Sequence, residues 1–254
     1  MKAATKKILD LSGRMGLLLM NNGGEVQRAE DIMHRVCLSS KEITSADALA
    51  TPGWVIITVH AHGQSFTSMT RTKPGRSDLS RVQTVNEIAR AYLAGSLQVE
   101  EADRLLDEML ERPARRRHLQ LLGGILAPMC ITLLGRTGLV DALAAGFASA
   151  CLVLVDRRLD PLGIAPFMHT FLVSMVGAFV ALLLHKIGVV DNIAQVLIGS
   201  IMVQFPGILL ANSVRDSLSG DVITGQSGMI QALATALALG MGVGFMLLLF
   251  GGSI

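Results

Sequence analysis

The second half of the chain has few charged residues. Residues 119–254 contain 5 Lys/Arg and 6 Asp/Glu, whereas residues 1–117 contain 17 Lys/Arg and 14 Asp/Glu. The first part has the charge content of an ordinary soluble domain, and the second has the composition of a membrane protein. We therefore expect a soluble domain over residues 1–117 and a membrane domain over residues 118–254.

Cysteine is scarce too, and familiar catalytic motifs are absent from the sequence. Cys37, Cys130 and Cys151 have no metal-ligand spacing, which favours small packing residues over a metal or redox site. The chain contains no G-x-S-x-G, no H-E-x-x-H and no phosphate-cradling glycine loop. We expect no enzyme activity, no metal, no cofactor and no ATP site in this chain. The apolar run at 15–20 is too short for a signal peptide, so the N-terminal domain is expected in the mature protein.

The periodicity of residues 1–117 changes from helical to strand-like and back. Apolar residues recur at helical spacing in four segments, and three short segments between them are rich in Ile, Val, Thr and Phe. This pattern predicts an α+β domain with a three-stranded meander. The expected helices are Ile8–Asn21, Glu25–Leu38, Leu79–Tyr92 and Val99–Leu110, and the expected strands are Glu42–Leu49, Trp54–His60 and Gln64–Thr70.

Five apolar segments follow, each approaching the ~20 residues that a bilayer core requires. They cover about 119–135, 138–155, 164–184, 188–210 and 228–250, and predict an all-α bundle of five transmembrane helices. Basic residues favour a cytoplasmic N-terminus and an outer C-terminus, with the lipid bilayer between. The cytoplasmic flanks would hold Arg112, Arg115, Arg116, Arg117, Arg157, Arg158 and Arg215, against Arg136 and Lys186 outside. The run at 115–117 is then a topology signal rather than a nucleic-acid site.

Pro206-Gly207 interrupts the fourth apolar segment. Proline has no N–H, so the carbonyl of Met202 is expected to lose its helical partner. If a helix restarts at Gly207, the N–H groups of 207–210 would face a cavity and suit a substrate carboxylate. The alternative is an ordinary proline kink packed against its neighbours.

Two stretches resemble motifs of the bacterial threonine/serine exporter family. Gly24–Asp31, read G-E-V-Q-R-A-E-D, resembles its G-A-E-x-x-R-x-E element, and His62-Gly63-Gln64 resembles its strand region. A second, more specific element matches Pro206, Gly207, Asn212, Arg215, Asp216, Gly220, Asp221 and Gly225.

The resemblance implies an exporter in the bacterial inner membrane. Long members of the family carry a second helical bundle, whereas this chain resembles the large subunit of the split form, which implies a small membrane subunit as partner. Split members are linked to dicarboxylates such as succinate and fused members to threonine and serine, so the substrate stays open. Further oligomerisation is a second expectation, and a nucleic-acid partner is not expected.

Candidate site residues fall into three groups. Asn212 and Asp216 share a helix face if the helix continues, and a solvated loop is the alternative reading of their surroundings. The expected substrate pathway comprises Gln195, Ser200, Gln204, Pro206, Gly207, Asn212, Arg215, Asp216, Gly220 and Asp221, with packing as the alternative for the first three. Asp141 and Asp191 are proton-coupling candidates or interfacial carboxylates.

The third group lies in the soluble domain. It comprises Gly24, Glu25, Arg28, Glu30 and His62, with helix capping as the alternative for its acidic residues. His60 and His62 are two apart on a predicted strand and should point to one face. A metal or hydrolase-like centre with Glu25 is less favoured than surface histidines.

Three functions remain in competition. The first is a secondary exporter of small carboxylate-bearing metabolites, the second is an enzyme on a membrane anchor, and the third is a membrane-bound metabolite sensor. An anchor requires one helix rather than five with a broken fourth, which weakens the enzyme, whereas the sensor stays open beside the exporter.

Overall fold

The structure is a computed structural model that describes residues 3–72, 77–111 and 117–250, with the side chains of residue 3 and of 117–120 left out. The expected topology signals Arg112, Arg115 and Arg116 lie outside the described residues. The chain divides into two compact units. Unit 1 comprises Met1–Pro113 and Ile208–Met229, and unit 2 comprises Ala114–Gly207 and Ile230–Ile254.

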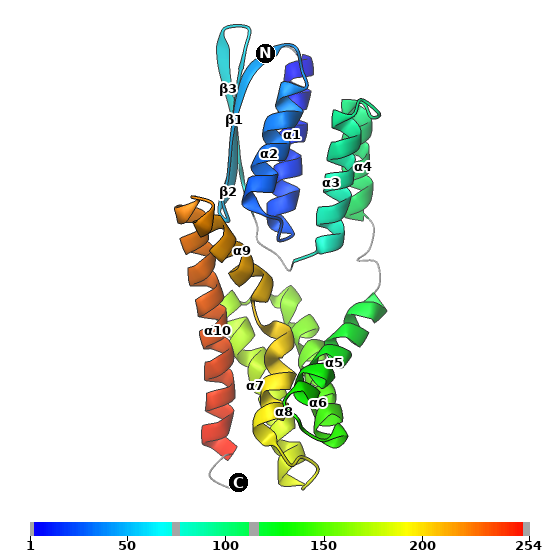
Figure 1. Cartoon of the computed structure of the whole chain (residues 1–254), viewed down its shortest axis with the longest axis vertical. Coiled ribbons are helices and arrows are strands. Elements are labelled where there is room, and N and C mark those ends of the chain that lie inside the picture. Colours follow the sequence, from blue (N-terminus) through cyan, green and yellow to red (C-terminus); the bar gives the residue numbers. More distant parts are fainter. Residues whose placement is uncertain (1–2, 73–76, 112–116, 251–254) are drawn as a thin grey trace. The chain divides into compact units, whose positions relative to one another are not determined.

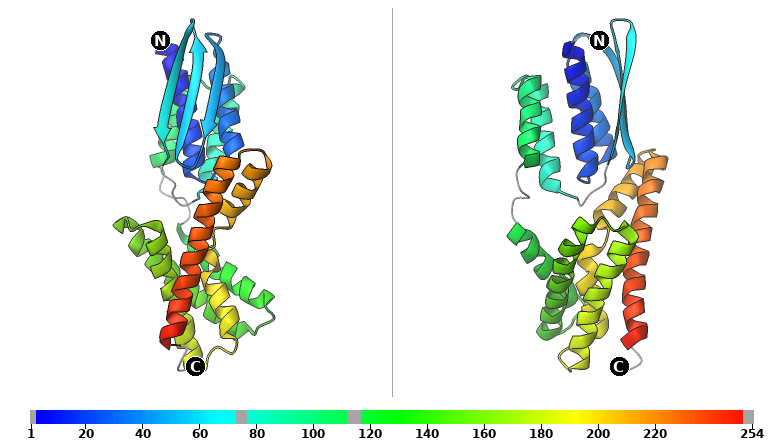
Figure 2. Two further views of the ribbon diagram at one scale, coloured as in Figure 1. Left: turned by 90° about the vertical axis from the view of Figure 1, so that its left-hand side faces the viewer. Right: turned by 180° about the vertical axis from the view of Figure 1, so that it is seen from behind.

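Unit 1 has three layers (Figures 1 and 2). An antiparallel sheet of order β1-β2-β3 packs on α1 and α2, and the α3–α4 hairpin covers the other side of these two helices. Two later segments complete the unit: most of α9 and the first part of α10. Their bounds are α1 Ala3–Asn21, α2 Val26–Leu38, β1 Ile43–Ala50, β2 Trp54–Ala61, β3 Gln64–Arg71, α3 Leu79–Leu93, α4 Val99–Glu111, α9 Gly207–Leu218 and α10 Val222–Phe250.

The core of unit 1 follows the two periodicities of the sequence. On β2, Val55, Ile57 and Val59 alternate with more exposed residues and face the helices. On α2, Ala29 and Met33 are fully buried one turn apart. The four helices and three strands expected for this part of the chain are thus confirmed.

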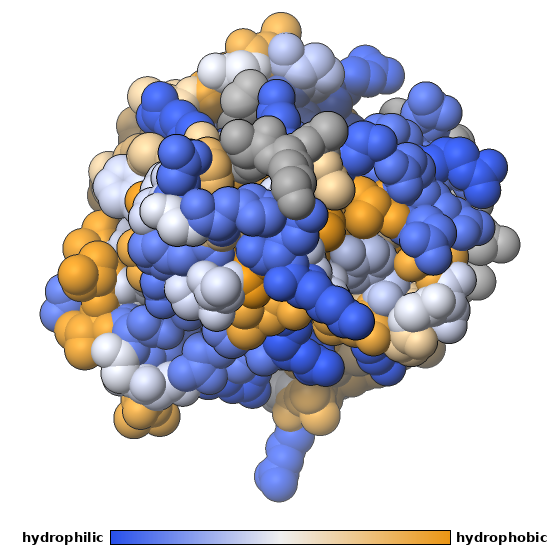
Figure 3. Space-filling view, turned by 90° about the horizontal axis from the view of Figure 1, so that it is seen from above, coloured by the Kyte–Doolittle hydropathy of each residue, from blue (hydrophilic) through white to orange (hydrophobic). Residues whose placement is uncertain are grey.

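Hydrophilic side chains predominate on the face of the molecule that Figure 3 shows.

Unit 2 contains helices joined by short loops, and no strand, within its described residues. Small residues such as Ala145, Ala148, Ala178 and Ala181 are fully buried between its helices and let their backbones approach closely. Its elements are α5 Arg117–Leu134, α6 Leu139–Leu159, η1 Asp160–Leu162, α7 Pro166–Lys186, α8 Ile193–Ile201, η2 Met202–Gln204 and the remainder of α10.

Three helices of the described chain are long and apolar enough to cross a membrane: Leu139–Leu162, Pro166–Lys186 and Val222–Phe250. A fourth span results if Ile193–Gln204 and Gly207–Leu218, which are bent by 65° at their break, are counted as one. The apolar part of α5, Leu121–Leu134, is shorter. The membrane character of the second half agrees with its composition, and the count of five crossings stays a prediction.

Candidate functional site

The two motif segments meet in unit 1. Asn212 Nδ2 on α9 donates a hydrogen bond of 3.4 Å to the carbonyl oxygen of Gly23, 189 positions earlier in the chain. One turn further along α9, Arg215 Nη1 lies 3.4 Å from Glu25 Oε2. The start of α2 is therefore the place where α9 docks.

The chain enters α2 through a tight connection. The N–H of Gly24 donates to the carbonyl of Leu19 at 2.8 Å, and a Cβ on Gly24 would lie 2.8 Å from that same oxygen. A side chain at this position would require the backbone around Leu19 to shift. Glu25 occupies the N-cap position but makes no side-chain cap hydrogen bond, and its carboxylate pairs with Arg215 instead. Capping is therefore not the role of the Glu25 side chain.

Glu30 lies on α2, five residues after Glu25, and its side chain is only partly exposed. Its Oε1 accepts a hydrogen bond of 2.8 Å from the backbone N–H of Ala50 at the end of β1. Burial raises the pKa of Glu30, the Ala50 N–H opposes this rise, and the carboxylates of Asp221 and Asp216 add to it. Glu30 is therefore close to both aspartates of the second motif.

Asp216 is the buried member of this group. It is 4% exposed, and its Oδ1 has no hydrogen-bond partner among the described residues. A buried carboxylate oxygen without a donor is costly and identifies a place where a donor fits. Together we call Glu25, Glu30, Asp216 and Asp221 the acidic cluster.

The turn between α9 and α10 sets the spacing of the two aspartates. Gly220 has φ +98°, and the N–H of Asp221 returns to the carbonyl of Asp216 at 2.9 Å, which is the pattern of a glycine-terminated helix. The carbonyl of Asp221 then accepts the first α10 hydrogen bond, 2.9 Å from the N–H of Gly225. A Cβ on Gly225 would collide with Ser213 and Ser217 of α9, so this glycine permits the close helix crossing.

Comparison with known proteins shows which family the chain belongs to. The family model ThrE, described as "Putative threonine/serine exporter", matches residues 10–250. The chain belongs to the ThrE family. A Mycobacterium tuberculosis protein named "Probable threonine/serine exporter" is 26% identical over 251 residues, which is 94% of this chain and 45% of that protein. A Corynebacterium glutamicum protein named "Threonine/serine exporter" is 24% identical over 182 residues, 67% of this chain and 36% of that protein.

The chain thus spans less than half the length of these ThrE relatives. No solved structure matches it significantly. The family points to a transporter rather than an enzyme, and its members' names agree with the apolar helices of unit 2.

At the break of this ThrE chain, the carbonyl of Met202 has lost its α-helical partner, as expected. It accepts a hydrogen bond of 3.1 Å from the N–H of Phe205 instead, in a 3₁₀ turn. The helix does restart at Gly207, as expected. The break therefore begins four residues before Pro206 and is a short 3₁₀ connection rather than a single kink.

The three polar residues of the fourth apolar segment differ in their surroundings. Ser200 is fully buried, and its hydroxyl donates to the carbonyl of Leu197 in its own helix at 2.9 Å. The side chain of Gln195 packs against Gly135. Gln204 has a buried Nε2 without a hydrogen bond within the described residues. Packing thus accounts for Ser200 and Gln195, and Gln204 keeps an unmet donor.

Asp141 and Asp191 come together in unit 2. The carboxylate of Asp141 is 3% exposed and accepts backbone N–H bonds from Asp191 at 2.9 Å and from Asn192 at 3.3 Å. The side chain of Asp191 is exposed. Asp141 therefore holds the loop that leads into α8, whatever further role it has.

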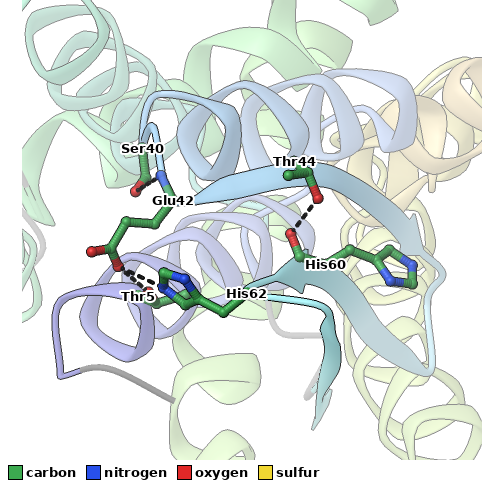
Figure 4. Close-up of polar contacts among 6 residues, drawn as sticks. All are labelled: Thr5, Ser40, Glu42, Thr44, His60 and His62. Atoms are coloured by element: carbon green, nitrogen blue, oxygen red, sulfur yellow. Dashed lines mark hydrogen bonds and ion pairs between the residues drawn. The ribbon is translucent and has the colours of Figure 1, made fainter.

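The expectation that His60 and His62 point to one face of a strand was wrong, whereas the favoured interpretation of surface histidines agrees with their exposure. His60 is the last residue but one of β2, and its Nδ1 lies 2.8 Å from Ser65 Oγ. His62 lies in the β2–β3 turn with φ +53°, and its Nε2 lies 3.3 Å from Glu42 Oε2 (Figure 4). Because His62 and Gly63 both have positive φ, they form a two-residue hairpin turn, and the period-2 rule for strands does not apply to them. Glu25 takes no part in either contact, since it pairs with Arg215.

No group of three or more His, Cys, Asp or Glu side chains that could hold a metal is present within residues 3–72, 77–111 and 117–250. Arg28, an expected site residue of the first motif, lies away from the acidic cluster. It lines a cavity of 380 Å³ between α2 and α3 together with Arg35 and Arg90.

Sequence reasoning missed one pair of ionisable residues. Asp156 and His169 lie 3.7 Å apart between α6 and α7 of unit 2. Asp156 directly precedes two arginines at the end of an apolar segment, so it looked like part of an ordinary charged flank. The signal that could have found it is a carboxylate and a histidine on either side of a short interhelical loop.

Proposed function

We propose that this chain is the large subunit of a secondary transporter that exports small amino acids of the threonine/serine class. The single observation that carries the proposal is the meeting of the two motif segments at the acidic cluster, with the buried, unpartnered Oδ1 of Asp216 among them. The names of the two relatives support the same class of function.

The charge of the cluster favours a substrate with an ammonium group. The acidic cluster has four carboxylates, and the one guanidinium that pairs with it is that of Arg215, which is 61% exposed and lies 3.4 Å from Glu25. An ammonium group would donate to Asp216 Oδ1, and the attraction of the nearby carboxylates would offset the hydration that it loses there. A dicarboxylate such as succinate would be repelled by the same groups. The substrate carboxylate of an amino acid would pair with Arg215.

The proposed arrangement in the membrane follows the charge bias. Unit 1 would face the bacterial cytoplasm, so that the acidic cluster meets its substrate there, and the C-terminus would lie outside the inner membrane. The pathway would be completed by a small membrane subunit, in keeping with relatives whose length is more than twice the matched region. The conformation at Pro206-Gly207 would line this pathway, and the pair of subunits would form a larger oligomer.

Flux measurements test the substrate class. The chain is reconstituted into vesicles with and without the small subunit, and release of labelled threonine is compared with release of labelled succinate. We expect threonine release that requires both subunits. Succinate release without threonine release would refute the assignment of the acidic cluster.

A matched pair of variants tests the cluster itself. Asp216→Asn keeps the shape of the side chain and removes its charge, so threonine release should be lost. Asp10→Asn removes an exposed carboxylate of α1 in the same unit and should leave release unchanged. Equal release by both variants would show that Asp216 does not contact the substrate.

The sensor alternative is separated by the same preparation. If the chain is a sensor, the full chain would bind threonine tightly, and no flux would be seen even with the small subunit present. An exporter must show flux, and it must bind threonine weakly enough to release it.

A further inference from the structure

A cavity of 380 Å³ lies between α2 and α3 of unit 1, and no residue of the acidic cluster lines it. Its volume falls in the range of small-molecule sites, about 300–1,000 Å³. The two helices run side by side in the same direction. Near their starts the N–H of Asp78 donates to the carbonyl of Asn22 at 3.0 Å, and at their ends Ser39 Oγ lies 3.1 Å from Tyr92 Oη. One end of the cavity is therefore near the starts of both helices, and the other is near their ends.

The middle of the cavity is mostly apolar. Ile32 of α2 and Ala89 of α3 are buried, and Val82 is half-buried. Asn86 adds an amide, whose Nδ2 donates to the carbonyl of Val82 at 2.6 Å. An apolar lining with a few polar groups is typical of a site for a small organic molecule.

Arginines lie at both ends of this cavity. Arg35 and Arg90 belong to the last turns of α2 and α3, whereas Arg28 belongs to the first turn of α2, about 10 Å earlier along its axis. Among the described lining residues Asp31 supplies the one carboxylate, and its Oδ2 lies 3.4 Å from Arg35 Nη1. Three guanidiniums against one carboxylate give the lining an excess of positive charge, which suits an anion.

Helix stability accounts for two of these arginines but not for the third. The helix dipole favours a cation in the last turn, where Arg35 and Arg90 lie, and disfavours one in the first turn. Arg28 is in that unfavourable position, and its side chain makes no ion pair or hydrogen bond among the described residues. Arg90 donates through Nε to the carbonyl of Asn86 at 3.3 Å, which leaves its terminal nitrogens for another acceptor. Both ends of the cavity thus offer donors to a ligand.

We infer that this cavity binds a phosphorylated organic acid, that is, a phosphate monoester whose apolar body carries a second acidic group. The phosphate lies between Arg35 and Arg90, because two guanidiniums suit a group with a charge of about −2 better than a single carboxylate. The body of the ligand packs on Ile32 and Ala89, and the second acidic group pairs with Arg28. The inference goes beyond the proposed transport function and does not rest on it.

Calorimetric titration of the intact chain in detergent tests the site with two probes. Para-carboxyphenyl phosphate has both acidic groups on an apolar ring, and phenyl phosphate lacks the carboxylate. We expect both probes to bind at about pH 8, where the phosphate is doubly charged. The first should bind about 10-fold more tightly, because it makes one more charged contact.

Variants separate the two ends of the cavity. Arg28→Gln should weaken the binding of para-carboxyphenyl phosphate about 10-fold and leave that of phenyl phosphate nearly unchanged, whereas Arg90→Gln should weaken both about 10-fold. Asp31→Asn removes the carboxylate that competes for Arg35, so both probes should bind about 2-fold more tightly, a gain that misfolding cannot produce. The matched control is Arg104→Gln, which removes a 66% exposed arginine of α4 outside the cavity and should change neither affinity.

Four results would overturn the inference. The first is no saturable binding of either probe, and the second is equal affinity of Arg28→Gln and Arg104→Gln for para-carboxyphenyl phosphate. The third is binding of succinate as tight as that of para-carboxyphenyl phosphate, which would exclude a site built for phosphate. The fourth is displacement of both probes by phosphatidylglycerol in the detergent, which would assign the arginines to a lipid headgroup. The titration requires no threonine flux, so failure of the inference and failure of the proposed function are distinguishable.

Discussion

The α9–α10 crossing at Gly225 provides a sharp test of the geometry around the acidic cluster. In Gly225→Ala, the new Cβ would lie 2.8 Å from both the carbonyl oxygen of Ser213 and the amide nitrogen of Ser217, and closer still to the Ser217 hydroxyl. Because two of these are backbone atoms, a rotamer change cannot relieve the collision. Overpacking typically costs about 1–3 kcal/mol, and backbone contacts place this one at about 3 kcal/mol.

Alanine also gains about 1 kcal/mol over glycine as a helix former, so the net loss is about 2 kcal/mol. For a protein of this size, that corresponds to a fall in Tm of about 4–8 °C. Gly240→Ala is the matched control on α10, because a Cβ there would meet nothing within 4 Å. This substitution should not lower the Tm, because alanine stabilises the helix by about 1 kcal/mol relative to glycine.

Trp54 is the single tryptophan and lies on β2 of unit 1, so its fluorescence during heating in detergent reports the unfolding of this unit. Gly225→Ala should lower that midpoint, and Gly240→Ala, which lies in unit 2, should leave it unchanged. Equal midpoints for Gly225→Ala and the unmodified chain would refute the close crossing, and with it the placement of Asp216 and Asp221 beside Glu30.

Three further predictions concern buried ionisable groups. Because burial raises the pKa of Glu30, the folded chain binds this proton more readily than the unfolded chain, and stability falls as pH rises from about 4 through the raised pKa. Glu30→Gln keeps an acceptor for Ala50, so thermal unfolding should show it to be more stable than the unmodified chain at pH 7 and equal to it near pH 4; a constant difference would contradict this. Asp141→Ala removes the acceptor of two backbone N–H groups before α8 and should lower the free energy of unfolding by about 1.5–3 kcal/mol, whereas no loss in a denaturant titration would exclude the hydrogen bonds. Burial raises the pKa of Cys37 to about 11, so alkylation at pH 8 should be about 100-fold slower in the folded than in the unfolded chain, and equal rates would show that the thiol is accessible.

Local periodicity was sufficient to predict the elements of unit 1. The expected helix Glu25–Leu38 is α2, Val26–Leu38, and the expected strand Trp54–His60 is β2, which ends at Ala61. Both have a buried face with a clear period, and period is a property of neighbouring residues. The prediction for the histidine pair failed because it relied on the same local periodicity. His62 was assigned the strand period, although the following glycine made a two-residue turn possible.

Contacts between distant segments could not be predicted in this way. Nothing in the spacing of either motif indicates that Arg215 meets Glu25, because the pairing depends on how α9 packs on the start of α2. The same holds for Asp156 and His169, which lie on two different helices. Their separation along the chain is short, but only the packing of α6 on α7 decides whether they face each other.

The second motif combines residues that shape the backbone with residues that carry charge. Gly220 reverses the chain and Gly225 permits the crossing, so the two glycines determine where Asp216 and Asp221 lie. The charged residues do not hold the hairpin together, because Arg215 pairs with α2 rather than with the aspartates beside it, and Asp216 has an oxygen without a partner among the described residues. A fold that places a carboxylate against other carboxylates, at a cost in stability, is expected where function requires a cation to bind. This arrangement supports the proposal that the motif is a positioned binding site rather than a structural hairpin.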